Sequence, residues 1–235
     1  MRVSLSEIQT FITKACVEAG LPLGLAQDAG HAARHVIRHG SRQLETFVKA
    51  IDTIDQKRSV TYDIDKAILG HFIPSHLDKH LSALYAAPSA CDLLLLNETQ
   101  RTEQDYITLT NVDIPAVVIA EVSAASENID RKFCLSWNIN GTYDVHGICW
   151  QGSLVLIKGT VTELLSTQSS EMTLKPVELE NKFEKCIPEC VDQVASPHIE
   201  EKTWERILTY VDRSLVKATE TSRLTGAGAG VIDKD

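Results

Sequence analysis

Residues that could bind an acid or transfer a proton are concentrated in two stretches of the sequence. In the first, Arg34, Arg38 and Arg42 recur every fourth residue, so they form one stripe if the segment is a helix. Guanidinium groups bind carboxylates through two parallel hydrogen bonds, and the imidazole of His39 titrates near neutral pH. This stretch therefore predicts a carboxylate site, with Arg34 and Arg42 binding the ligand and His39 as catalytic acid or base.

The same stretch leaves two other interpretations open. His31, His35 and His39 form a second stripe with a spacing of four, which allows two imidazoles to reach one metal ion. No glutamate stands where the H-E-x-x-H pattern of zinc enzymes requires it, and we identify no further ligand, so we assign no metal-binding residue. A simple solvated helix face is the other interpretation.

The second stretch is a glycine run in which Gly226, Gly228 and Gly230 alternate with alanines. Glycines let backbone amides approach a ligand closely, and beside Ser222 and Arg223 such amides can hold a carboxylate or phosphate. A dinucleotide-binding loop would need a helix directly after the glycines. Residues 231–235 are too few for that helix, which argues against a dinucleotide-binding loop.

Acidic side chains surround the end of this run and extend the predicted site. Asp233 and Asp235 could bind a cation or dock on a basic face, whereas a flexible tail would do neither. Val231 and Ile232 are apolar, which favours an ordered segment. The ligand-binding residues predicted here are Ser222, Arg223, Gly226, Gly228, Gly230, Asp233 and Asp235.

Two further pairs have metal-ligand spacing but lack partners. His76 and His80 are four residues apart in a weak helical pattern over residues 75–85, and three residues separate Cys186 from Cys190. Neither pair has a second pair to complete a zinc site. Exposed imidazoles and reduced thiols are the favoured interpretation, and the residues indicate no particular cofactor.

Composition narrows the classes of partner. The 235 residues include 32 acidic and 23 basic side chains, a net charge of −9, which argues against a general nucleic-acid binder. No apolar run approaches the ~20 residues of a membrane helix, and the N-terminus has no signal-peptide pattern. We expect a cytoplasmic protein whose partner is a small anionic molecule, and a homo-oligomer is compatible with the sequence.

The pattern of apolar residues predicts the elements that must position these groups. Periods typical of helices occur in residues 5–19, 23–39 and 42–54, the first after a Ser4–Glu7 capping box. Residues 115–126 fit either a helix or a buried strand, and a last helix is expected to open at Ser196-Pro197. Strands are predicted over residues 106–110, 132–137, 145–150, 153–162 and 171–177.

This order of elements predicts an α+β fold in a single domain, residues 1–235. Residues 1–55 would form a three-helix unit packed on a mostly antiparallel sheet from residues 105–180. Residues 196–235 would supply a C-terminal helix and an ordered glycine-rich tail.

Both ends of the chain resemble an uncharacterised bacterial family, a domain of unknown function. The resemblance lies in the C-terminal pattern S-R-x-x-G-A-G-A-G-x-x-D-x-D of residues 222–235 and in Ala19-Gly20-Leu21-Pro22 with the helical residues up to Arg34. Lys234 stands where the family has asparagine. The resemblance implies that the two ends belong to one folded unit, and it implies no activity.

A weaker similarity links the N-terminal residues to the malate/L-lactate dehydrogenase family that lacks a Rossmann fold. It rests on residues 19–22 and on His39-Gly40 followed by residues 41–48. In that family the histidine of a Ser-His-Gly motif does acid–base work, which implies this role for His39. Arg38 replaces the serine, and the chain is about 100 residues shorter than such enzymes.

Two functions follow as hypotheses. In the first, the protein binds or acts on a small organic acid in a pocket between the N-terminal helices and the glycine-rich segment. In the second, it is a non-catalytic assembly module whose tail docks on itself or on a partner subunit. The sequence does not decide whether a reaction is catalysed.

Overall fold

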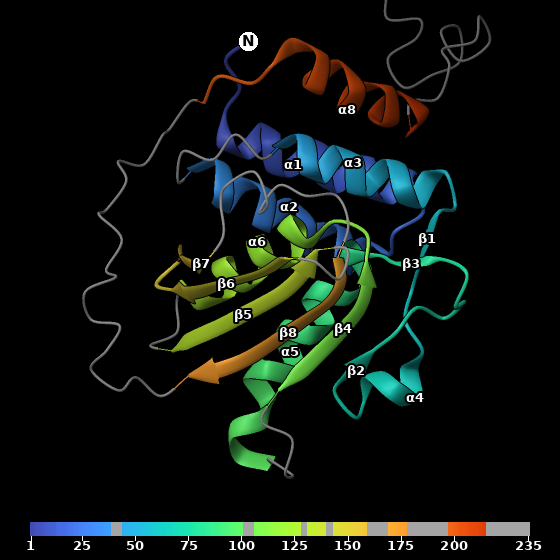
Figure 1. Cartoon of the computed structure of the whole chain (residues 1–235). Helices are drawn as coiled ribbons and strands as arrows, with labels where there is room; N and C mark the ends of the chain where they lie inside the picture. The colour runs from blue at the N-terminus through green and yellow to red at the C-terminus, as the bar shows by residue number, and fades with distance from the viewer. Residues whose placement is uncertain are drawn as a thin grey trace, which may run out of the picture.

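The computed structural model describes residues 1–38, 44–100, 106–127, 131–139, 143–158, 169–177 and 197–214. In these residues the helices form layers against one open sheet (Figure 1). The α+β class predicted from the sequence is confirmed. Residues 39–43, the hairpin signal at residues 140–141 and the glycine-rich tail lie outside the described residues.

Three N-terminal helices form as the sequence predicts: α1 (Leu5–Glu18), α2 (Leu23–Arg38) and α3 (Leu44–Asp55). The capping box at the start of α1 is present, because Ser4 and Glu7 accept hydrogen bonds from each other's backbone amides. The apolar face of α1 is fully buried against α2, where Gly30 lies so close to α1 that a Cβ would be 2.7 Å from the Gln9 carbonyl. This close packing holds the polar face of α2 in a fixed position.

The larger part of the sheet is antiparallel, as expected. Its strands are β4 (Ile107–Val112), β8 (Ser169–Val177), β5 (Lys132–Ile139), β6 (Tyr143–Trp150) and β7 (Ser153–Lys158), in that spatial order. Alternate residues of β5 and β8 are buried, so one face of each strand packs against the helices. The helix-facing residues are Phe133, Leu135, Trp137, Met172 and Leu174.

Three two-residue strands extend the sheet in parallel, which the sequence analysis did not predict. They are β1 (Ser59–Val60), β2 (His71–Phe72) and β3 (His80–Leu81); β1 pairs with β3, and both β2 and β3 pair with β4. A strand of two residues is too short to show the alternation of apolar and polar residues that identifies strands in a sequence. The expected helix over residues 75–85 is wrong for the same reason: His80 is in a strand, and His76 is in a bend before it.

Two helices lie directly behind the sheet, α5 (Ala83–Gln100) and α6 (Pro115–Ser126) (Figure 1). The sequence analysis missed α5, which contains Pro88 and is rich in buried alanines, because it has no strong polar face. For residues 115–126, the helix is the correct alternative, with Pro115 in the first turn. Both helices carry their apolar residues on nearly every side, as expected for a middle layer.

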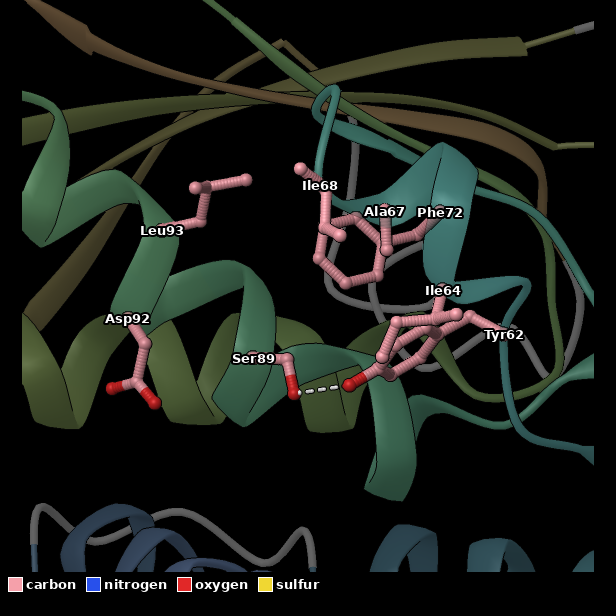
Figure 2. A pocket seen from close by; sticks show the side chains of 8 residues that line it. All are labelled: Tyr62, Ile64, Ala67, Ile68, Phe72, Ser89, Asp92 and Leu93. Atoms are coloured by element: carbon pink, nitrogen blue, oxygen red, sulfur yellow. Dashed lines mark hydrogen bonds between the residues drawn. The ribbon is translucent and has the colours of Figure 1, made fainter. Parts of the chain in front are cut away.

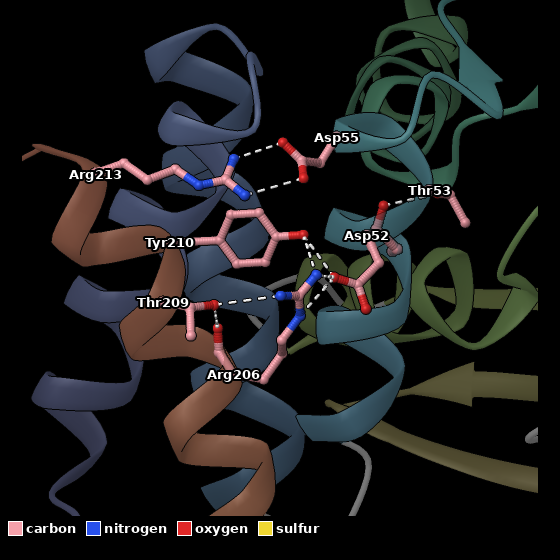
Figure 3. Close-up of polar contacts among 8 residues, drawn as sticks. Asp52, Thr53, Asp55, Arg206, Thr209, Tyr210 and Arg213 are labelled. Carbon is pink, nitrogen blue, oxygen red and sulfur yellow. Dashed lines mark hydrogen bonds and ion pairs between the residues drawn. The ribbon is translucent and has the colours of Figure 1, made fainter.

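The last helix, α8 (Glu201–Ser214), covers α1 and α3. It begins later than predicted because residues 197–199 pair with the N-terminal residues: Val3 donates to the Pro197 carbonyl and Ile199 to the Met1 carbonyl. Ion pairs join α8 to α3, from Arg206 to Asp52 at 2.7 Å and from Arg213 to Asp55 at 2.5 Å (Figure 3). In the described part of the chain, no helix is long and apolar enough to span a bilayer.

One carboxyl group in the helix layer has an unusual environment. Glu121 of α6 is 7% exposed, and its Oε1 accepts no hydrogen bond within the described residues. Burial raises the pKa of Glu121 to about 8, and the carboxylates of Asp28 and Asp92 add to this shift. The folded protein therefore holds a proton on Glu121 over a pH range in which the unfolded chain, with a pKa near 4.5, has lost it.

We expect Glu121 to make the protein less stable as pH rises from about 5 to about 9, because the folded state binds the extra proton. Glu121→Gln keeps the side chain neutral, so it should flatten this dependence and raise stability at pH 9 by a few kcal/mol, at ~1.4 kcal/mol per pKa unit. Urea unfolding from pH 5 to pH 9 measures the effect. Glu205→Gln, at an exposed position of α8, is the control and should keep the wild-type slope.

Candidate functional site

A cavity of about 300 Å³ lies between α2 and α6 and is lined mainly by basic groups. The lining residues are His31, Arg34, His35, Arg38, Ala124 and Glu127. The four from α2 occur at a spacing of three or four, which places them on one face of the helix. The cavity therefore joins the arginine stripe and the histidine stripe that the sequence analysis treated as separate alternatives.

His35 forms the inner wall of this cavity and is almost fully buried. Its Nε2 is 2.8 Å from the carbonyl oxygen of Gly152, which can only accept, so this nitrogen carries a proton and donates it. Its Nδ1 is 3.1 Å from Oε2 of Glu127. Burial lowers the pKa of His35, although the bond to the Gly152 carbonyl opposes this. A hydrogen bond between Nδ1 and the Glu127 carboxyl needs one further proton, carried by either group.

Glu127 connects His35 to the open side of the cavity. Its side chain is about one-third exposed, and its Oε1 accepts a hydrogen bond from the guanidinium of Arg38. Arg34 is more exposed and donates to the Gln9 side chain at 3.0 Å. The cavity thus has a cationic rim and a proton-carrying wall, an arrangement suited to an acid that exchanges a proton.

A tight hairpin turn holds His35 from behind. Gln151 and Gly152 both have positive φ angles, 47° and 77°, and join β6 to β7 in two residues. The carbonyl of Gly152 accepts from His35 and from Ser123, and its amide donates to Ser126. The two backbone polar groups of Gly152 therefore link the β6–β7 turn to α2 and α6.

Ser123, His35 and Glu127 have the residue types of a nucleophilic triad, but the arrangement is not one. The Ser123 hydroxyl donates to the Gly152 carbonyl at 2.8 Å and lies 3.3 Å from His35 Nε2, which already donates its proton to that carbonyl. Ser123 is buried and does not line the cavity. Among the described residues, none is placed as a general base for this hydroxyl, so Ser123 has a supporting role.

Of the site residues predicted from the sequence, Arg34 lies in the described part of the chain, and it lines the cavity. The others lie outside the described residues, and their roles stay predictions: His39, Arg42, Ser222, Arg223, Gly226, Gly228, Gly230, Asp233 and Asp235. Among the described residues, no group of three or more histidine, cysteine, aspartate or glutamate side chains is placed to hold a metal ion.

Sequence reasoning missed Glu127, Ser123 and the Gly152 carbonyl as partners of His35. A signal for His35 exists, because it lies between Ala32 and Val36 on the apolar side of α2, whereas His31 is exposed. A histidine on a buried face needs partners for both ring nitrogens. Its partners are 88 to 117 residues away in sequence, beyond the reach of any local pattern.

Another cavity, of about 220 Å³, lies between α4 (Ile64–Ala67) and α5 and is mainly apolar (Figure 2). Its polar groups include the Tyr62 and Ser89 hydroxyls, which bond to each other at 2.8 Å. Apolar side chains form most of the wall, and Asp92 lies to one side. This lining offers no cation to bind an anionic ligand, so it is not the candidate site.

Comparison with known proteins places the N-terminal part of the chain. Residues 3–69 match the model of a family described as a protein of unknown function, DUF3726. The matched region runs from α1 through α4 and includes the basic face of α2. No curated protein matches the chain, and no solved structure does.

Gly152→Ala tests whether the turn and His35 are packed as described. A Cβ at position 152 would lie 2.9 Å from Cε1 of His35 and 3.3 Å from the Glu127 side chain. We expect a loss of at least ~2 kcal/mol in unfolding free energy, of which ~1–2 kcal/mol comes from the positive φ. Gly20→Ala is the matched control, because Gly20 also has positive φ but has open space around its Cβ position. Equal losses in the two variants would contradict the contact with His35.

Proposed function

We propose that the protein binds a small organic acid in the cavity between α2 and α6. The observation that carries the proposal is the lining itself, in which two guanidinium groups and two imidazoles of α2 face one cavity of about 300 Å³. This volume is at the lower end of small-molecule sites and suits an acid of a few carbon atoms. The ligand carboxylate would contact Arg34 and His31 at the rim.

The proton of the hydrogen bond between His35 and Glu127 gives the proposed site its chemistry. A ligand held at the rim would meet the Glu127 carboxyl, which is open to the cavity and backed by the buried imidazole. Exchange of this proton would then accompany binding. His39, which follows Arg38 in the sequence, stays the proposed acid–base residue for any reaction, as the dehydrogenase resemblance implies.

The C-terminal residues would close this cavity. Ser222, Arg223 and the glycines of residues 226–230 supply the donors that a carboxylate needs. If they do so, a chain that lacks residues 226–235 should bind the acid more weakly and keep its oligomeric state. A changed oligomeric state with unchanged affinity would favour the assembly hypothesis instead.

Arg34→Gln tests the binding proposal directly. We expect lactate, succinate or malate to bind the wild-type protein in calorimetric titrations, and the affinity to fall ~10-fold or more in the variant, because a charged hydrogen bond contributes ~1.5–3 kcal/mol. Lactamide, which has no carboxylate, should not bind. Lys202→Gln removes one positive charge from the exposed face of α8 and should bind like wild type.

Two results would overturn the proposal. One is equal affinity of the Arg34→Gln variant and wild type for every acid that binds. The other is tighter binding of inorganic phosphate than of all the carboxylates, which would replace the carboxylate by a phosphate as the ligand group.

A further inference from the structure

A second polar cavity, of about 230 Å³, opens where β4 ends and α6 begins. It is separate from the α2–α6 cavity, and the two share no lining residue. Its charged and imidazole groups come from α3, from the residue before β1, from β3 and from the β4–α6 junction. These groups are Lys49, Asp52, Arg58, His80 and Asp113.

The two cations of this cavity are available to a ligand. The Arg58 side chain is exposed, and it makes no hydrogen bond or ion pair with any described residue. Lys49 pairs with Glu45 one turn earlier at 3.0 Å, but both side chains are largely exposed, and such pairs contribute little. A ligand carboxylate could therefore bind both cations without breaking a strong contact.

Asp52 brings an unused acceptor to the same cavity. Its Oδ1 accepts all three bonds from α8, two from Arg206 at 3.0 and 2.7 Å and one from the Tyr210 hydroxyl at 2.5 Å (Figure 3). Its Oδ2 accepts none from the described residues, and Figure 3 shows this oxygen turned away from Arg206 and Tyr210. The carboxylate is thus fixed by one oxygen and open at the other.

His80 offers a second acceptor, because its tautomer is fixed. Asn111 donates through Nδ2 to the Lys79 carbonyl at 2.9 Å, so its Oδ1 faces Nδ1 of His80 at 3.0 Å. Nδ1 is then the donor to Asn111, and Nε2, which bonds to no described residue, is the acceptor when the ring carries one proton. Asn111 holds this position with a positive φ of 56°, a conformation that asparagine tolerates better than most residues.

Asp113 contributes a wall of the cavity but no free acceptor. It is 2% exposed, and both of its oxygens already accept hydrogen bonds, from the amides of Ala83 and Ile114 and from the Thr53 hydroxyl. The groups that remain for a ligand are two cations and two acceptors. A simple anion would satisfy the cations alone, and a simple amine the acceptors alone.

We propose that this cavity binds a zwitterion, a free α-amino acid. The amino acid's carboxylate binds Arg58 and Lys49, and its ammonium group donates to Asp52 Oδ2 and His80 Nε2. The volume of about 230 Å³ accommodates a small amino acid and is below that of a typical drug-sized site.

Three probes of nearly the same size separate the charges of the ligand. Alanine carries both groups, propionate lacks the ammonium, and ethylamine lacks the carboxylate. After a thermal-shift screen of the common amino acids, the full chain is titrated with these three compounds while NMR follows the Cε1–H signal of His80. We expect saturable shifts with alanine and an affinity at least ~10-fold lower for propionate and ethylamine, since each loses a charged hydrogen bond.

Substitutions of lining residues test whether alanine binds in this cavity. Arg58→Gln and His80→Gln should each weaken alanine binding ~10-fold or more, and their thermal midpoints show that they are folded. Lys66→Gln removes a charge from α4, outside the cavity, and should bind like wild type. Arg34→Gln should also leave alanine binding unchanged, which keeps this test independent of the organic-acid site.

Three outcomes overturn the proposal. Propionate that binds as tightly as alanine would make this a plain anion site, and ethylamine that does so would make it a cation site. Saturation by no amino acid in the screen, with the wild-type protein folded, would show that the cavity has no such ligand.

Discussion

The buried carboxylate of Asp113 is the contact on which the arrangement of layers depends. Oδ1 accepts from the amides of Ala83, at the start of α5, and of Ile114, directly before α6, at 2.9 and 2.6 Å. Oδ2 accepts from Thr53 near the end of α3 at 2.7 Å. A carboxylate suits this place, because first-turn amides have no partner within a helix and attract negative charge. One side chain thus fixes three helices relative to the end of β4.

The two polar cavities have separate linings. The first is lined by the polar face of α2 and the end of α6. The second lies beside Asp113, between α3 and the end of β4. In each cavity, a histidine is held by a residue remote in sequence, His35 by Gly152 and His80 by Asn111. A histidine held by a hydrogen bond beside an arginine is the chemical feature that the two cavities share.

Local patterns were sufficient for α1 to α3, because each carries an apolar stripe at helical spacing. They were also sufficient for the antiparallel strands, where burial alternates along Phe133, Leu135 and Trp137. They failed where tertiary contacts decide: α5 has no polar face, and β3 exists because it pairs with β1 and β4. The same distinction holds for the candidate site. Arg34 was predicted because it belongs to a stripe on one helix, whereas Glu127 and Gly152 contact His35 only in the folded chain.

The position of β8 has a consequence for synthesis of the protein. This strand comes late in the sequence but lies between β4 and β5, so it joins two strand groups made before it. A nascent chain that ends before residue 169 therefore holds two partial sheets, each with an unpaired inner edge. Such edges are templates for pairing with other chains, and contacts between distant residues form slowly. Translation that pauses in this interval would leave the nascent protein most prone to aggregate, and completion of β8 would end that exposure.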